Sequence, residues 1–180
     1  MNFNHNKMTR SIFSSLFVSI LLFACTQKAN LSQSNSLLYA FKTQTGINAA
    51  QATDDSLLIK AKRWQGSGNY LGVDAWEVFE ISANTKLYGG LPGQSEFYSV
   101  EKSIVDVNFD KVKYWESLQV AQHPTFGYRP KVAEYFANSL IKVAVSKTLA
   151  NPKYGQGGAW QVFVDNYSKK ITFVKEILLK

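Results

Sequence analysis

Cysteine and histidine are scarce in this chain of 180 residues, which has one cysteine, Cys25, and two histidines, His5 and His123. A single thiol cannot form a disulfide within the chain, and it cannot supply the several thiolates of a structural zinc site. Two histidines so far apart do not form a histidine-rich metal site either. We therefore expect a domain that is stabilised by packing and holds no metal.

The chain also lacks three motifs of common enzymes: the Gly-x-Ser-x-Gly elbow, the phosphate-cradling Gly-x-x-x-x-Gly-Lys loop and the dinucleotide-binding Gly-x-Gly-x-x-Gly. A Ser-His-Asp triad would have to use His123, which precedes Pro124 in an expected loop. Five glutamates could supply the paired carboxylates of a glycosidase: Glu77, Glu80, Glu96, Glu101 and Glu116. Their spacing does not show that any two of them converge. The alternation of Glu77 and Phe79 is more simply that of a half-solvated strand.

Positive charge exceeds negative charge without forming a basic tract. The 20 lysines and arginines outnumber the 13 acidic residues, which gives a net charge of +7. The densest groups are Lys60-Ala61-Lys62-Arg63 and Lys169-Lys170, and no run of five cations occurs. Composition therefore predicts no nucleic-acid binding. A mildly cationic surface is better suited to anionic lipid or cell-wall polymer.

The N-terminal segment has the layout of a secretory signal. Lys7 and Arg10 precede an apolar run from Ile12 to Ala24, and the first acidic residue is Asp54. The run is shorter than the roughly 20 apolar residues that span a bilayer. We expect residues 1–24 to be a signal peptide whose removal lowers the net charge from +7 to +5, because the segment contains Lys7 and Arg10 and no acid.

The apolar run ends in Leu22-Phe23-Ala24-Cys25, which resembles the lipobox of bacterial lipoprotein signal peptides. The resemblance implies that Cys25 is lipidated, with acyl chains such as palmitate, and becomes the new N-terminus in the cell envelope. Several acyl chains anchor a protein stably to a membrane. Thr26 after the cysteine favours the outer membrane if the host is Gram-negative. An uncleaved membrane anchor and a freely secreted product are the alternatives.

The rest of the chain predicts a tether and one domain. Residues 25–55 are rich in Gln, Ser, Asn, Thr and Ala and predict a flexible tether behind the lipidated Cys25. Its apolar segment, Leu37 to Phe41, could dock on the domain. Residues 56–180 have a globular composition. We expect a small α+β fold in which an antiparallel or mixed sheet is covered by one or two helices.

Apolar patterning and turn residues place the expected elements. Strands are expected at residues 75–81, 85–88, 96–100, 104–107, 160–164 and 171–179, the last two as a hairpin through 165–168. Residues 57–64 could form a helix or a strand, and residues 112–120 are expected to be helical.

The stretch after Pro130 is ambiguous in the sequence. Val132, Phe136, Leu140 and Val143 recur at helical spacing, and Pro130 suits the first turn of a helix. The residues from Ile141 to Val145 also alternate as a strand would. We favour a helix from about residue 130 and leave its C-terminal part open.

Two glycine-containing segments point to a function. Residues 85–99 pass from a strand through Gly89-Gly90-Leu91-Pro92-Gly93 to Phe97-Tyr98-Ser99. Residues 151–161 contain Tyr154-Gly155-Gln156-Gly157-Gly158 and lead to Gln161. This pairing resembles the necrotizing-toxin type of NAD glycohydrolase domain, a branch of the ADP-ribosyltransferase-like toxin folds.

The resemblance implies an enzyme that cleaves the nicotinamide–ribose bond of NAD. Gln161 would be the catalytic residue, and Tyr88, Ser99 and Tyr154 would line the NAD site. NAD would be the substrate, with no further cofactor, and an immunity protein would be the expected partner. Strand alternation agrees with this role, because Gln161 points away from Trp160 and Val162 and can face a cleft.

This chain departs from that family's pattern, and the family's Pro-Gly-Gly-Gly run is reduced to Gly157-Gly158. Family members carry an arginine just after the first strand, where this chain has Gly89. The alternative function is therefore a non-catalytic envelope lipoprotein that uses its cationic, aromatic surface to bind cell-wall polymer or a partner protein. For any one aromatic residue, packing in the core of a small α+β domain is the favoured interpretation.

Overall fold

The computed structural model describes residues 37–65 and 74–180 of the chain. The expected signal peptide and Cys25 lie outside the described residues. The sheet and the helices that cover it lie within residues 38–180. Within the described ranges, no helix has both the length and the apolar composition needed to cross a bilayer.

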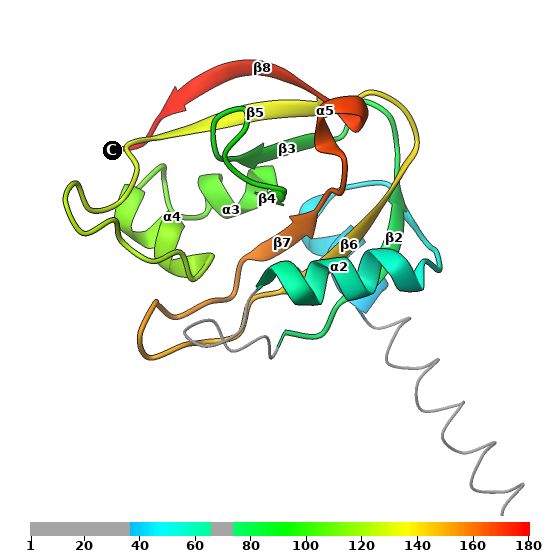
Figure 1. The fold of residues 1–180 in the computed structure, drawn as a ribbon, viewed down its shortest axis with the longest axis horizontal. Helices are drawn as coiled ribbons and strands as arrows, with labels where there is room; N and C mark the ends of the chain where they lie inside the picture. Colours follow the sequence, from blue (N-terminus) through cyan, green and yellow to red (C-terminus); the bar gives the residue numbers. More distant parts are fainter. Residues whose placement is uncertain (1–36, 66–73) are drawn as a thin grey trace, which may run out of the picture. The chain divides into compact units, whose positions relative to one another are not determined.

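Eight strands form one sheet in the order β1-β2-β6-β7-β4-β3-β5-β8, and every neighbouring pair is antiparallel (Figure 1). The strands are β1 (Ala49–Gln51), β2 (Glu77–Ile81), β3 (Lys86–Gly89), β4 (Phe97–Ser99), β5 (Lys131–Ala137), β6 (Ile141–Lys147), β7 (Trp160–Phe163) and β8 (Ile171–Leu178). The helices are α2 (Asp55–Gln65), α3 (Glu101–Val105), α4 (Lys111–Ser117) and α5 (Tyr167–Lys170), and residues 37–45 are also helical. The expected α+β class with an antiparallel sheet is confirmed.

The helix expected after Pro130 is wrong, because this stretch forms the adjacent strands β5 and β6. Strand β5 lies between β3 and β8, and its residues from Val132 to Tyr135 are all buried. A strand that is covered on both faces loses the alternation of polar and apolar residues that marks a half-exposed strand. Its apolar residues then fall at helical spacing by coincidence.

Two further expectations are corrected. Residues 104–107 do not form a strand, because Ile104 is buried on the short helix α3 while its neighbour Val105 is exposed. Residues 165–168 do not connect a hairpin: β7 lies between β6 and β4, whereas β8 pairs with β5 at the edge of the sheet. The chain instead passes through α5 to reach that edge.

The folded unit also begins earlier than residue 56. Phe41 is fully buried, and its ring centroid lies 5.5 Å from that of Phe79 and 5.1 Å from that of Trp160. Strand β1 pairs with β2 through Ala49, Ala50 and Gln51. The part of the expected tether from residue 38 to 55 is therefore folded with the domain, because its apolar residues pack and its backbone completes the sheet.

Candidate active site

A row of six residues crosses one face of the sheet. Each residue lies directly opposite the next in the register of adjacent strands: Lys175, Glu134, Tyr88, Ser99, Gln161 and Ser146. Directly paired residues of antiparallel strands project to the same side. The row therefore places Tyr88, Ser99 and Gln161 next to one another on three adjacent strands, although 73 positions separate the first from the last.

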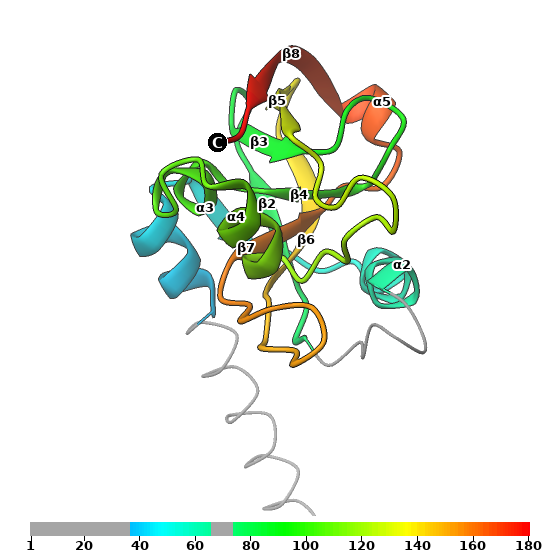
Figure 2. The same ribbon diagram turned by 90° about the vertical axis from the view of Figure 1, so that its left-hand side faces the viewer.

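Two groups of helices cover this face on either side of the row's centre. Ile104 of α3 and Tyr114 of α4 pack with Tyr88 in one apolar cluster. Leu57 of α2 packs with Phe163 in another, and Phe163 lies two positions beyond Gln161 on β7. Figure 2 shows α4 and α2 standing apart, with β4, β6 and β7 between them in this view.

A pocket of about 220 Å³ opens over this part of the sheet. Its walls come from the end of α2 (Trp64 and Gln65), from α4 and the residues that follow it, and from β3, β4 and β7. The polar side chains that line it are Gln65, Asp74, Tyr88, Gln94, Ser95, Tyr98, Ser99, Tyr114, Gln119, Arg129, Thr148 and Gln161. Such a mixture of rings and converging polar groups is typical of a small-molecule site.

The hydroxyl groups in the pocket are neutral. Ser99 Oγ and Tyr114 Oη lie 2.8 Å apart in a hydrogen bond, and both residues are fully buried. Burial raises the pKa of Tyr114 well above its ordinary value, although the bond to Ser99 opposes this. Tyr88 donates to Glu101 Oε1 at 3.2 Å, and burial followed by the charge of Glu101 raises the pKa of Tyr88 as well. These phenols are hydrogen-bonding groups and not anions at neutral pH.

Two side-chain amides that line the pocket have buried atoms without a hydrogen-bond partner among the described residues. They are Oε1 of Gln161 and Nε2 of Gln119. Leaving such an atom unpaired costs about 1–3 kcal/mol. The residues that line the pocket therefore include one unsatisfied acceptor and one unsatisfied donor.

One carboxyl group in the pocket has a displaced pKa. Asp74 is 5% exposed and accepts hydrogen bonds from the Gln65 side-chain amide and from the Leu149 backbone N–H at 2.9 Å. Burial raises the pKa of Asp74, and the two hydrogen bonds lower it by less. Asp74 is therefore a candidate for accepting or donating a proton at this site.

Arg129 is the one arginine or lysine among the described residues that line the pocket. Its Nη1 donates to Gln94 Oε1 at 3.4 Å and lies 3.3 Å from the position that a Cβ would take at Gly90. At Gly89, where the resembled family has arginine, a Cβ would lie 2.7 Å from the ring of Tyr98. The Tyr98 ring and the Phe97 carbonyl oxygen leave little room for a side chain at Gly89, and the positive charge of Arg129 reaches the same loop from a distant segment.

Three of the four expected site residues line the pocket: Tyr88, Ser99 and Gln161. Tyr154 is not among the residues that line it; this side chain is buried in the turn from Asn151 to Gly155, with Lys153 Nζ 5.4 Å from its ring centroid. His123 is also outside the pocket lining, stacked on Phe126 at 3.7 Å in an exposed loop.

The sequence analysis missed Asp74, Gln119 and Arg129. Each lies outside the two glycine-containing segments and reaches the pocket through the tertiary fold. Of these three residues, only Arg129 has a recognisable sequence pattern, because it follows an aromatic residue in a loop. That pattern is too common to identify a site residue. Among the described residues, no group of three or more His, Cys, Asp or Glu side chains could hold a metal ion.

Comparison with known proteins gives two kinds of match. Residues 53–166 match the family model described as Rhs1 C-terminal toxin domain. The solved structure titled "Rhs1-CT in complex with cognate immunity protein RhsI1" has a TM-score of 0.65 and 32% identity, over 71% of this chain and 98% of that chain. A more distant structure, "Structure of Tse6 in complex with Tsi6", has a TM-score of 0.43 and 12% identity over 67% and 93%. No curated protein matches the chain.

Proposed function

The chain belongs to the Rhs1 C-terminal toxin domain family, and we propose that its toxic activity is hydrolysis of the nicotinamide–ribose bond of NAD in the pocket over β3, β4 and β7. The observation that carries the proposal is the buried, unpartnered Oε1 of Gln161 beside the hydroxyl pair of Ser99 and Tyr114. This arrangement supports the role that the sequence resemblance implies for Gln161.

The proposed reaction consumes water and needs no further cofactor. The bond between C1′ of the ribose and the pyridinium nitrogen breaks, and its electron pair stays on that nitrogen as neutral nicotinamide leaves. The oxygen of water bonds to C1′, and one of the water protons passes to solvent or a nearby base. The products are nicotinamide, ADP-ribose and one proton.

Gln161 suits the transition state of this reaction because its amide is neutral and fixed. The ribose develops oxocarbenium character as the bond breaks, and an amide oxygen can accept a hydrogen bond from a ribose hydroxyl or from the attacking water. Fixed dipoles that face developing charge stabilise a transition state without reorganising. Ser99 lies opposite Gln161 in the strand register and defines the adjacent wall, while its own hydroxyl is held by Tyr114.

Charge in the pocket is consistent with a dinucleotide. Arg129 lies beside the loop from Gly90 to Gln94, where its guanidinium can pair with the pyrophosphate. Tyr88 is 3% exposed and packs in the apolar cluster, so its part in binding is to form the pocket wall. Trp64 is 61% exposed at the rim and offers a ring for stacking on a base.

Proton NMR of NAD incubated with the purified protein tests the proposal. Wild-type protein should release free nicotinamide, and Gln161→Ala should release at least about 100-fold less at unchanged thermal stability. The matched control is Gln156→Ala, which removes the same side chain from an exposed position five residues earlier. If wild-type protein neither releases nicotinamide nor broadens the NAD signals, the proposed activity is excluded.

We also propose that an immunity protein binds this domain, because the structural relative at 32% identity is in complex with its cognate immunity protein. Addition of such a protein in equimolar amount should abolish nicotinamide release. A domain that binds cell-wall polymer instead would sediment with peptidoglycan at low salt and dissociate at moderate salt. Absence of sedimentation at low salt would remove that alternative.

The proposed location is the bacterial envelope, with Cys25 as the lipidated residue. Cys25→Ser should release the protein from the membrane fraction or block its maturation. If this variant fractionates and matures like wild type, the proposed lipid anchor is excluded, and the toxin assignment is unaffected.

A further inference from the structure

Gln119 combines several unfavourable features in one residue. It follows the C-cap of α4, and its φ of 59° lies in the left-handed region, which is costly for a residue with a side chain. The residue is 8% exposed. Its backbone N–H donates to Glu116 O at 3.1 Å, but its side-chain Nε2 is buried without a partner among the described residues.

The side chain faces the pocket, which it lines together with Trp115, Leu118 and Val120. These three neighbours pack in the apolar cluster beneath α4. A neutral N–H donor among apolar side chains is matched by a neutral acceptor. An anionic phosphate would lose its hydration there without gaining a counter-charge, whereas Arg129 supplies that charge elsewhere in the pocket.

The size of the pocket limits which part of a dinucleotide Gln119 can meet. Its volume of about 220 Å³ is below the roughly 300–1,000 Å³ typical of pockets for drug-sized ligands. It therefore holds one end of NAD. Because Gln161 is assigned to the reacting ribose and lines the same pocket, the portion that Gln119 meets is the nicotinamide riboside end.

We propose that Gln119 selects the nicotinamide ring by donating a hydrogen bond from Nε2 to the carbonyl oxygen of its carboxamide. The carboxamide oxygen is the neutral carbonyl acceptor at this end of NAD, and it lies on the ring that leaves when the bond breaks. The inference rests on the proposed NAD hydrolysis and adds a specificity-determining residue to it. The left-handed backbone at Gln119 holds the donor in place before the substrate arrives.

The test compares two proteins, each with two substrates. kcat/KM is measured for NAD and for pyridine adenine dinucleotide, which lacks the carboxamide, with wild-type protein and with Gln119→Leu. The substitution should lower kcat/KM for NAD by about tenfold, mostly through KM, and leave the analogue nearly unchanged. For each protein, kcat/KM for NAD is divided by kcat/KM for the analogue. Comparing this quotient between wild type and Gln119→Leu cancels the chemical difference between the leaving groups.

Two further variants keep the test decisive. Gln122→Leu makes the same substitution at an exposed position three residues later and should leave kcat/KM unchanged for both substrates. Gln119→Met, which is similar in length and also lacks the donor, replaces Gln119→Leu if the latter unfolds. Equal losses on NAD and on the analogue would show that Gln119 is only structural, while the wild-type turnover would still support NAD hydrolysis.

Failure of the proposed function gives a different pattern. If wild-type protein releases no nicotinamide from NAD, saturation-transfer NMR with nicotinamide alone becomes the measurement. Binding to wild type that weakens about tenfold in the Gln119 variants would support the carboxamide contact. Nicotinamide that does not bind wild type, or binds the variants equally, would overturn it.

Discussion

The two glycine-containing segments look alike in sequence but serve the pocket in different ways. Residues 85–99 line it along most of their length, from Tyr88 and the two following glycines to Ser99. Of residues 151–161, only Gln161 lines it. Glycine beside a strand therefore predicts a close approach of backbone, but it does not say whether a ligand or another part of the protein makes that approach.

In the second segment the approaching group is the protein itself. A Cβ at Gly155 would lie 2.3 Å from the backbone oxygen of Glu116, and one at Gly157 would lie 2.4 Å from that of Leu149. The Ala159 N–H donates to Ser117 O at 3.3 Å. These contacts fix the end of α4 against β7, and thereby fix the position from which Gln119 enters the pocket.

The largest effect on this comparison should come from Gly155→Ala. The new Cβ meets rigid backbone, and the φ of 143° is unfavourable for alanine, so unfolding should become easier by roughly 2–4 kcal/mol. In the first segment, Gly93→Ala has a φ of 84° but open space around the new Cβ, and should cost only about 1 kcal/mol. Urea unfolding midpoints of the two variants measure the difference. Equal shifts would mean that the second segment does not depend on this contact.

The sequence predicted some strands of the sheet better than others, for a physical reason. Turn residues next to strand β2 mark its end in the sequence, and the expected strand lies within two residues of the observed bounds. Strand β5 is buried on both faces and was taken for a helix. Alternation reports exposure, so it disappears where the fold covers both sides of a strand.

The same limit applies to the pocket. Tyr88, Ser99 and Gln161 were selected by a motif, yet they meet because they are register partners, and register is a property of the assembled sheet. Gln119 and Arg129 carry no motif, and their positions depend on how the chain between α4 and β5 folds back over the sheet. Tyr154 shared a motif with Gln161, but a tight turn buries its ring outside the pocket lining.

A smaller effect concerns the hydrogen bond between Ser99, at the end of the first segment, and Tyr114 of α4. Tyr114→Phe leaves the buried Ser99 hydroxyl without its partner and should lower the free energy of unfolding by about 1–2 kcal/mol. Adding Ser99→Ala to that variant should cost little more, because the bond is already lost. Urea denaturation of the two single variants and the double variant gives the coupling. Strictly additive losses would show that the two hydroxyl groups do not stabilise each other.

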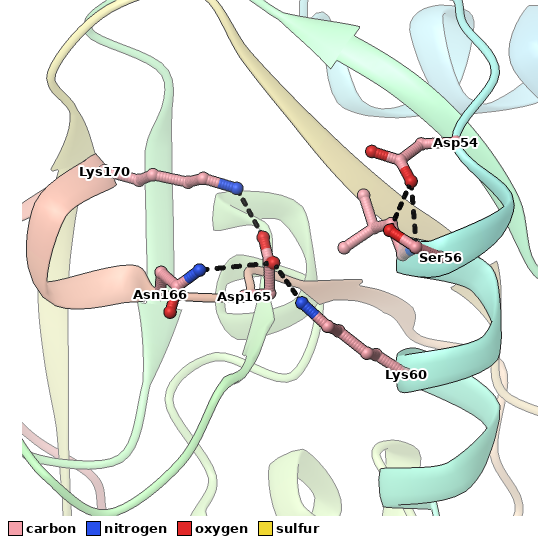
Figure 3. A network of polar contacts seen from close by, with 7 residues as sticks. Asp54, Ser56, Lys60, Asp165, Asn166 and Lys170 are labelled. Carbon is pink, nitrogen blue, oxygen red and sulfur yellow. Dashed lines mark hydrogen bonds and ion pairs between the residues drawn. The ribbon is translucent and has the colours of Figure 1, made fainter.

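The smallest effect should come from the residue that follows the second segment's strand. Asp165 pairs with Lys60 of α2 at 3.0 Å and with Lys170 of α5, and joins two helices distant in the sequence (Figure 3). Partial burial raises the pKa of Asp165, but the hydrogen bonds and charges of Lys170 and Lys60 outweigh it and leave the pKa below its ordinary value.

A lowered pKa means that the folded protein holds the charged carboxylate more tightly than the unfolded chain does. The resulting stability is present above the unfolded pKa of about 3.9 and is lost as the pH falls through the lower folded pKa. Asp165→Asn should therefore cost at most about 1 kcal/mol at pH 7, since the lysine partners are partly exposed. The difference between variant and wild type should shrink as acid unfolding is followed below pH 4. A difference that stays constant down to pH 2 would mean that Asp165 acts through packing or hydrogen bonding, because a charge effect must vanish once the carboxylate is protonated.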